Sequence, residues 1–431
     1  MHVAPIVAGI IFLLTFVAIL SGKVNRAVAA LIGAVVMVTV GHFMGFYDER
    51  HALEAIDFDT IGLLLGMMII VVLLEECGLI RYVAILVAKW SQGKPWLLLV
   101  VLGTSTTLAS MVLDNVTVMI LIGSVTILIC ELLGVSPVPF LIAEALLSDT
   151  GGVASLVGDP PNIIIGAAAG FTFVDFLSHL GPIVLAAWAA ALVLLRFVFR
   201  RELSQTPKRA AVLDGLDARQ ALQDPVAMRK ILVILAGVVA GFLFEPTLGL
   251  SPTFFALAGG IVALLWLRAD IDHVLRQVDW AVLTFFGALF ILVGGVEGSQ
   301  VIHLVASGVF DLTEKYPLLA GIVLLWLAAV LSAVVDNVPF TIAMVPIIKQ
   351  LGALGVSTSS LWWALALGAG FGGNGTLIGS TANVVTVSIS EKTSTPITSR
   401  IWMKSGLPVM IVTCIIASVL YALFFDWMQT P

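Results

Sequence analysis

The chain has 431 residues, of which 60% are hydrophobic and only 11% are charged, and its formal net charge is −6. Soluble domains carry about a quarter charged residues, so this composition excludes a soluble globular protein and indicates an integral membrane protein. The basic residues stand in a few short stretches, so no nucleic-acid partner is expected. The cysteines, Cys77, Cys130 and Cys414, are widely spaced and predict neither a disulfide framework nor a metal site.

Long apolar runs predict an all-α polytopic fold with about ten transmembrane helices, since a β-barrel would show short alternating strands. The N-terminus lacks a basic region and a small-residue cleavage site, so the first run is expected to be retained as a span. In the first half we predict spans at 3–20, 27–44 and 60–76, a long block at 95–130, a broken segment at 138–170, an interfacial segment at 171–180 and a span at 181–199.

The same order returns after a polar stretch at 200–230. Spans are predicted at 231–248, 252–268 and 280–296, followed by a long block at 317–348, a broken segment at 361–389 and a last span at 405–425. The block 95–130 would be about 54 Å long as one helix, which exceeds any bilayer, so both long blocks should fold back as re-entrant hairpins. Residues 1–199 and 231–431 are therefore expected to be two repeats.

Matching motifs support the repeat. Asp114-Asn115 and Asp336-Asn337 lie 222 residues apart, and Asn162 and Asn383 lie 221 apart. If the first span runs inward, 18 of the 21 Lys and Arg fall in cytoplasmic segments. This charge distribution places both termini outside the cytoplasm and loop 200–230 inside, and it makes the repeats inverted in the cell (inner) membrane, as in many secondary transporters.

Each Asp-Asn pair lies midway along an apolar run, where a carboxylate is costly and marks a functional site by default. The alternative is capping, because Asp and Asn both favour helix N-termini and turns. The two interpretations are compatible if Asn caps the helix while Asp carries a proton or helps to coordinate a cation at the tip of the hairpin.

The broken segments hold Gly158-Asp159-Pro160-Pro161-Asn162 and Gly379-Ser380-Thr381-Ala382-Asn383 at equivalent positions. Unwound backbone persists in a membrane only where protein or a wet cavity surrounds it, although a simple kink is an alternative. The candidate ion- or substrate-binding residues are Asp114, Asn115, Thr117, Asp149, Gly158, Asp159, Asn162, Asp336, Asn337, Asn374, Gly379, Ser380, Thr381 and Asn383.

Glu144 joins four of these aspartates as a fifth intramembrane carboxylate, and no Lys or Arg lies in the central part of a predicted span. Uncompensated carboxylates should hold protons or cations. Glu144 and Asp149 could equally lie near a polar boundary. Because Asp114 has more acidic and hydroxyl neighbours than Asp336, the first half is expected to bind the coupling ion.

The chain resembles the ion transporter superfamily, specifically its ArsB/NhaD group of arsenite pumps and Na⁺/H⁺ antiporters and the branch that contains the melanosomal P protein. The resemblance rests on Leu-Asp114-Asn-Val-Thr117, Val-Asp336-Asn-Val-Pro339, Gly158-Asp-Pro-Pro-Asn-Ile-Ile-Ile-Gly166 and Gly372-Gly-Asn-Gly-Thr-Leu-Ile-Gly379. More distant sodium–dicarboxylate symporters carry Ser-Asn-Thr at the hairpin tips, where Asp114 and Val116 flank the Asn here. The resemblance implies a possible Na⁺ site near Asn115, Gly158 and Asn162.

The resemblance further implies a homodimer in lipid that works by an elevator-like shift, with Na⁺ or H⁺ as coupling ion and no other cofactor. Its first substrate hypothesis is proton-coupled efflux of arsenite or antimonite, in which case a soluble ATPase is a possible partner. Na⁺/H⁺ antiport and Na⁺-coupled anion transport are the alternatives. A passive channel is another hypothesis, and an intramembrane aspartyl protease using Asp114 with Asp159 or Asp336 would be an enzyme; we expect a transporter, not an enzyme.

Overall fold

The structure, a computed structural model, describes residues 3–21, 23–204, 217–393 and 395–430. Every secondary-structure element in these ranges is a helix, which confirms the predicted all-α fold. Among the described residues, eight helices are long and apolar enough to cross a membrane, and shorter apolar helices accompany them. The chain is therefore a multi-pass membrane protein.

The first half follows the predicted order closely. Its helices are α1 (Val3–Leu20), α2 (Arg26–Met44), α3 (Glu49–Glu54), α4 (Phe58–Glu76), α5 (Leu79–Trp90), α6 (Pro95–Ser110), α7 (Asn115–Leu133), α8 (Val138–Gly152), α9 (Pro160–Ala169), α10 (Phe173–Val198) and α11 (Arg200–Leu203). The long block is split into α6 and α7 at the Asp-Asn pair, and the broken segment into α8 and α9. Part of the predicted loop 200–230, residues 205–216, lies outside the described residues.

The second half repeats this order. After the short helix η2 (Ala218–Ala221) come α12 (Pro225–Leu243), α13 (Glu245–Leu248), α14 (Pro252–Leu267), α15 (Ile271–Gln277), α16 (Trp280–Gly298), α17 (Val301–Lys315), α18 (Pro317–Val335), α19 (Asn337–Ala353), α20 (Ser359–Gly373), α21 (Thr381–Ser390), α22 (Ser399–Met403), α23 (Gly406–Leu423) and α24 (Phe425–Met428).

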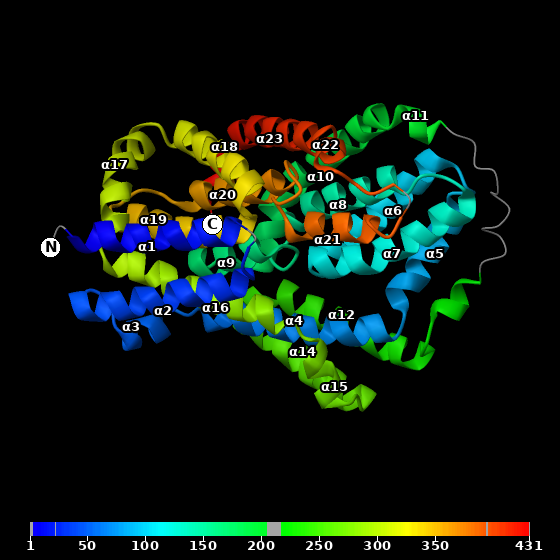
Figure 1. The fold of residues 1–431 in the computed structure, drawn as a ribbon, viewed down its shortest axis with the longest axis horizontal. Helices are drawn as coiled ribbons and strands as arrows, with labels where there is room; N and C mark the ends of the chain where they lie inside the picture. The colour runs from blue at the N-terminus through cyan, green and yellow to red at the C-terminus, as the bar shows by residue number, and fades with distance from the viewer. Residues whose placement is uncertain (1–2, 22, 205–216, 394, 431) are drawn as a thin grey trace.

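The two helical hairpins approach each other from opposite ends of the molecule. In Figure 1 the α6–α7 pair reaches the middle from the right and the α18–α19 pair from the left. Each first arm packs along the broken helix of its own half, α6 on α8 and α18 on α20. The tips and the breaks of both halves consequently meet near the centre.

Other contacts are exchanged between the halves in a matched way. Helix α2 packs on α16 while α4 packs on α14, and α7 contacts α21 while α9 contacts α19. Helix α2 is equivalent to α14, α4 to α16, α7 to α19 and α9 to α21. Exchanging equivalent helices therefore converts each contact into the other contact of its pair. The halves are therefore related by an approximate two-fold arrangement, and their shared interface contains both hairpin tips.

The structure corrects the predicted interfacial segment 171–180. Helix α10 begins at Phe173, because Thr172 and Asp175 form a capping box there, and it continues through Pro182 to Val198. The polar residue that interrupted the apolar pattern, His179, is buried and stacks between Trp363 and Trp427 at ring distances of 4.7 and 4.8 Å.

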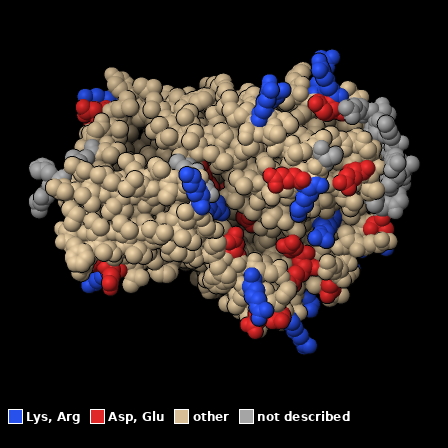
Figure 2. Space-filling model, in the orientation of Figure 1, with Lys and Arg blue, Asp and Glu red and all other residues tan. Residues whose placement is uncertain are grey.

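Among the described helices that the sequence did not predict, α5 and α17 are the longest. Helices α5 and α17 follow the third span of each half, and they are amphipathic, so a search for uniformly apolar runs passes over them. The predicted span 231–248 is also shifted, since α12 begins at Pro225, where Asp224 caps it, and ends at Leu243. Figure 2 shows the charged side chains gathered mainly towards one end of the molecule, over α5, α11 and α15, with few charged side chains on the rest of this face.

Candidate functional site

The two hairpin tips are built differently. In the first, residues 111–114 join α6 to α7, and the Asp114 carboxylate accepts a hydrogen bond from the Thr117 backbone N–H at 2.9 Å. In the second, Asp336 alone joins α18 to α19, with φ of 85°. A side-chain-bearing residue in that region is strained by about 1–3 kcal/mol, so packing around the tip must hold Asp336 there.

The structure reverses the expected roles of the paired residues. The aspartates cap, since Asp336 also accepts from the Val338 N–H at 3.2 Å. The asparagines reach inward. The Asn115 amide donates to Asp149 Oδ1 at 3.2 Å, and the Asn337 amide donates to Asp159 Oδ2 at 3.0 Å. Capping by Asp leaves the first helical residue, Asn, facing the broken segments.

Asp159 is at the N-cap position of α9, yet its side chain makes no cap hydrogen bond. Pro160 and Pro161 follow it and have no N–H to offer, so the carboxylate is available for another donor. That donor is Asn337 from the other half, in a place where Asp159 is only 3% exposed. The proline pair thus both breaks the helix and releases the carboxylate.

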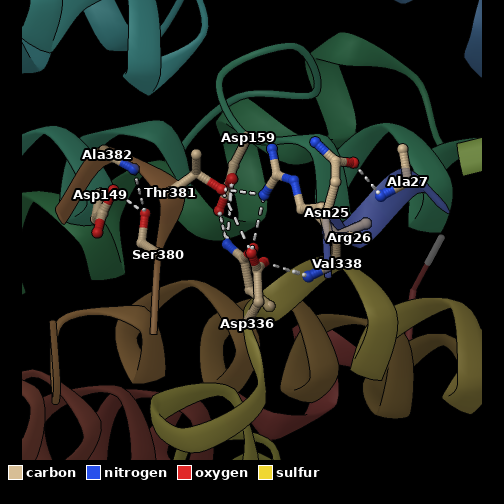
Figure 3. Close-up of polar contacts among 11 residues, drawn as sticks. Asn25, Arg26, Ala27, Asp149, Asp159, Asp336, Val338, Ser380, Thr381 and Ala382 are labelled. Carbon is tan, nitrogen blue, oxygen red and sulfur yellow. Dashed lines mark hydrogen bonds and ion pairs between the residues drawn. The ribbon is translucent and has the colours of Figure 1, made fainter. Parts of the chain in front are cut away.

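Asp149 joins both halves as well. Its Oδ1 accepts from Asn115 and from the Ser380 hydroxyl at 3.1 Å (Figure 3), whereas its Oδ2 is buried and has no hydrogen-bond partner among the described residues. Asp149 and Glu144 are 2% and 1% exposed, so neither lies at a polar boundary. Glu144 accepts from Thr126 at 2.6 Å, away from the tips.

Asn162 and Asn383 hold the breaks themselves. The Asn162 amide donates to three carbonyls of the first break, at 2.8 to 3.3 Å, and the Asn383 amide donates to the carbonyls of Gly373 and Thr376. Carbonyls left without helical partners are costly to bury, so these amides stabilise the unwound backbone. Neither Asn lines the cavity described below.

Glycine at 158 and 379 allows the hairpins to pack on the breaks. A Cβ at Gly158 would lie 2.6 Å from the Ser110 carbonyl oxygen, and one at Gly379 would lie 3.2 Å from Ala333 Cα. Asn374, another predicted site residue, also lies behind the tips. Its amide donates a hydrogen bond to the Thr150 hydroxyl at 3.1 Å and so connects α20 to α8. These residues position the site without facing the cavity.

Arg26 is a site residue that sequence reasoning missed. It is the first residue of α2, and its Nη1 lies 2.7 Å from Thr381 Oγ1 and 3.4 Å from Asp336 Oδ2 (Figure 3). The Thr381 hydroxyl also contacts Asp336 at 3.3 Å. The expectation that all intramembrane carboxylates are uncompensated is therefore wrong for Asp336. Arg26 lies between the predicted spans 3–20 and 27–44, and only the tertiary fold brings it to the tip.

A cavity of about 280 Å³ opens between the tips. Figure 2 shows acidic side chains at a hollow near the middle of this face. The predicted residues that line it are Asp114, Asn115, Thr117, Asp159, Asn337, Ser380 and Thr381. Lining residues that were not predicted include Arg26, Glu75, Gln277, Asp279, Phe285 and Phe286. Four carboxylates against one guanidinium make the cavity acidic, and all three cysteines are buried elsewhere.

A family model described as a citrate transporter matches residues 16–368, which is most of the chain. The chain belongs to this citrate transporter family. It is also a member of the wider ion transporter superfamily, which confirms the resemblance drawn from the tip and break motifs. Members of this kind are secondary transporters, and the cavity between two hairpin tips lies within the matched region.

Relatives support the assignment over the whole chain. A 46 kDa membrane protein of Mycobacterium leprae is 38% identical over 420 residues, with 96% of this chain and 97% of the relative covered. An uncharacterized transporter of Mycobacterium tuberculosis is 38% identical over 418 residues with the same coverage. The human P protein is 30% identical; the match covers 91% of this chain and 56% of that longer protein.

A solved structure shares the fold. The crystal structure of the YdaH transporter of Alcanivorax borkumensis superposes with a TM-score of 0.61, covering 98% of this chain and all of that one, at 18% identity. At that identity the likeness concerns the fold alone. It places the two hairpins and two broken helices of this transporter in an architecture already seen in a membrane transporter.

Proposed function

We propose that the chain is a proton-coupled secondary transporter in which a small cation, with Na⁺ as first candidate, competes with protons for Asp149 and Asp159. The observation that carries this proposal is the bonding of these two buried carboxylates. Their donors are uncharged amides and a hydroxyl, and among the described residues no Lys, Arg or His forms an ion pair with either.

A buried carboxylate without a countercharge is stable only if it is protonated or binds a cation. The unpartnered Oδ2 of Asp149 is the atom that would carry the proton, and deprotonation leaves an oxygen able to bind Na⁺. Proton release and cation binding would thereby exclude each other at one group. The first-half acids would use amide and hydroxyl groups from both halves to complete the ion's oxygen shell.

The tips supply a gate in this scheme. The amides of Asn115 and Asn337 each hydrogen-bond one of the two carboxylates from a hairpin tip. A change in the charge of Asp149 or Asp159 would therefore change the strength of the contact that holds that tip. Exchange across the membrane would follow by an elevator-like shift of the hairpins and broken helices against α2, α4, α14 and α16.

Proton-coupled efflux of arsenite or antimonite is the second candidate. Neutral arsenous acid needs hydrogen-bonding groups and no countercharge, and Thr117, Ser380 and Thr381 supply hydroxyl groups at the cavity. Thiol ligation is not available there, because Cys77, Cys130 and Cys414 are buried away from it. The family description makes citrate a third substrate to test, although the acidic lining would repel a free tricarboxylate.

A transport role also accounts for the acids better than a protease would. A protease dyad needs two carboxyl groups that share a proton. Here Asp114, Asp159 and Asp336 hydrogen-bond to amides, hydroxyls, backbone N–H groups and Arg26, and no hydrogen bond joins one described carboxyl to another.

The test is a proteoliposome assay with purified protein, an imposed pH gradient and a pH-sensitive dye inside. Na⁺, arsenite and citrate are added in turn, with N-methyl-D-glucamine chloride as the ionic control. We expect Na⁺ to drive proton movement and the other two solutes to leave it unchanged. Proton movement with arsenite or citrate but not with Na⁺ would replace the first candidate by that solute.

A further inference from the structure

The contact between Arg26 and the second hairpin tip has no equivalent in the first half. Arg26 is the first residue of α2, and the equivalent first residue of α14 is Pro252. Asp336 thus has a guanidinium at 3.4 Å, whereas Asp114 has no ion pair with any described residue. Arg26 therefore adds a positive charge to the second tip that has no counterpart among the described residues at the first tip.

The surroundings of Arg26 hold its charge in place. The guanidinium lies 5.4 Å from the ring centroid of Phe285 on α16, and its side chain is 35% exposed while that of Asp336 is 17% exposed. A cation over an aromatic face in a half-buried setting is favourable. Arg26 therefore faces the tip from α2, which packs on α16, and not from either hairpin.

We propose that Arg26 is a tethered cation that fills the ion position at the second hairpin tip. While the Arg26 guanidinium contacts Asp336, this carboxylate is not available to cations in the cavity. The same contact holds the second hairpin tip against the start of α2, which we call the fastening of the tip. Of the carboxylates at the hairpin tips and in the broken helices, only those of the first half are then open to a transported ion. The part of this inference that concerns transported cations rests on the proposed function, whereas the fastening of the tip does not.

Movement of the second tip relative to α2 must break two contacts at once, because Arg26 bonds both Asp336 and Thr381. These residues come from the hairpin and from the broken helix α21, so one guanidinium links three segments. Removal of the guanidinium should loosen the second tip and leave the first tip, at 111–117, unchanged.

Hydrogen–deuterium exchange of the full-length protein in detergent tests the fastening directly. In Arg26→Gln we expect amides at 333–341 to exchange about fivefold or more faster, with no change at 111–117. Arg26→Lys should restore most of the protection. Arg50→Gln is the matched control, since the exposed Arg50 pairs with Glu54 of its own helix and not with an aspartate at a hairpin tip. Unchanged exchange at 333–341 in Arg26→Gln would overturn the inference.

A double-mutant cycle tests the ion competition. The unfolding temperature is measured against NaCl at constant ionic strength for wild type, Arg26→Gln, Asp336→Asn and the double variant. We expect Arg26→Gln to respond at about fivefold lower Na⁺, and this shift to vanish when Asp336 is Asn. An equal shift in both backgrounds would overturn the inference. Faster tip exchange with no Na⁺ response in any variant would support the fastening and contradict the proposed Na⁺ transport.

Discussion

Asp149 is the single side chain on which the proposed ion coupling depends most. It accepts hydrogen bonds from Asn115 and Ser380 on one oxygen and leaves the other buried without a partner. The first-half residue that sequence reasoning favoured most, Asp114, instead caps α7. We therefore propose that ion coupling depends on Asp149 in the broken segment and not on Asp114 at the hairpin tip, which can be tested by comparing the two aspartates.

We predict that Asp149→Asn abolishes proton-coupled transport while the protein remains folded. The amide is the same size, and its oxygen can still accept from Asn115 and Ser380, but it can neither release a proton nor hold a cation. The measurement is Na⁺-driven proton movement in proteoliposomes, beside the unfolding temperature in detergent. Wild-type transport by this variant would exclude Asp149 as the proton carrier.

We predict that Asp114→Ala lowers the free energy of unfolding by about 0.5–2 kcal/mol, because it removes the cap of α7. Asp114→Asn should be close to wild type in stability, since Asn is an equally good N-cap. Denaturant titration of the purified variants checks both values. Equal stability of the Ala and Asn variants would contradict the capping role.

At the scale of elements, the breaks depend on close approach between backbone segments. The α6 terminus packs against Gly158, and the α18 terminus against Gly379, at distances that leave no space for a side chain. The unwound backbone is in turn held by Asn162 and Asn383. A hairpin and a broken helix of the same half therefore form one unit that is joined by small residues and amides.

We predict that Gly158→Ala destabilises the protein by about 1–3 kcal/mol and impairs transport, because the new methyl group must push α6 away from the break. Gly308→Ala is the matched control, since a Cβ there meets no atom within 4 Å and Ala favours the helix α17. Unfolding temperature and transport are measured for both. A harmless Gly158→Ala would show that the hairpin can separate from the break.

The sequence allowed the elements and the residues of the tips to be predicted well, since apolar runs, prolines and the internal repeat act locally. The hydrogen-bond and ion-pair partners of these residues could not be predicted. That Asn115 and Asn337 reach Asp149 and Asp159, and that Arg26 reaches Asp336, depends on how helices far apart in the chain pack together. The amphipathic helices α5 and α17 were not predicted for another reason. Their polar faces interrupt the apolar pattern from which spans are predicted.

At the scale of the whole molecule, the charge distribution predicts which end faces the cytoplasm. In a variant lacking Cys77, Cys130 and Cys414, we expect Glu314→Cys to react with an impermeant maleimide in intact cells. Glu202→Cys should react only after permeabilisation. Both positions are exposed at opposite ends of the predicted topology. Labelling of both from the same side would contradict the inverted arrangement of the repeats.

The exchange of contacts between halves has a consequence for the origin of such a chain. Asp159 takes its donor from Asn337, and Asp149 takes one of its donors from Ser380, so neither half contains a complete site. A protein made of one half alone would have needed a second copy to assemble even one. The two halves also differ at the start of equivalent helices, since α2 begins with Arg26 and α14 with Pro252.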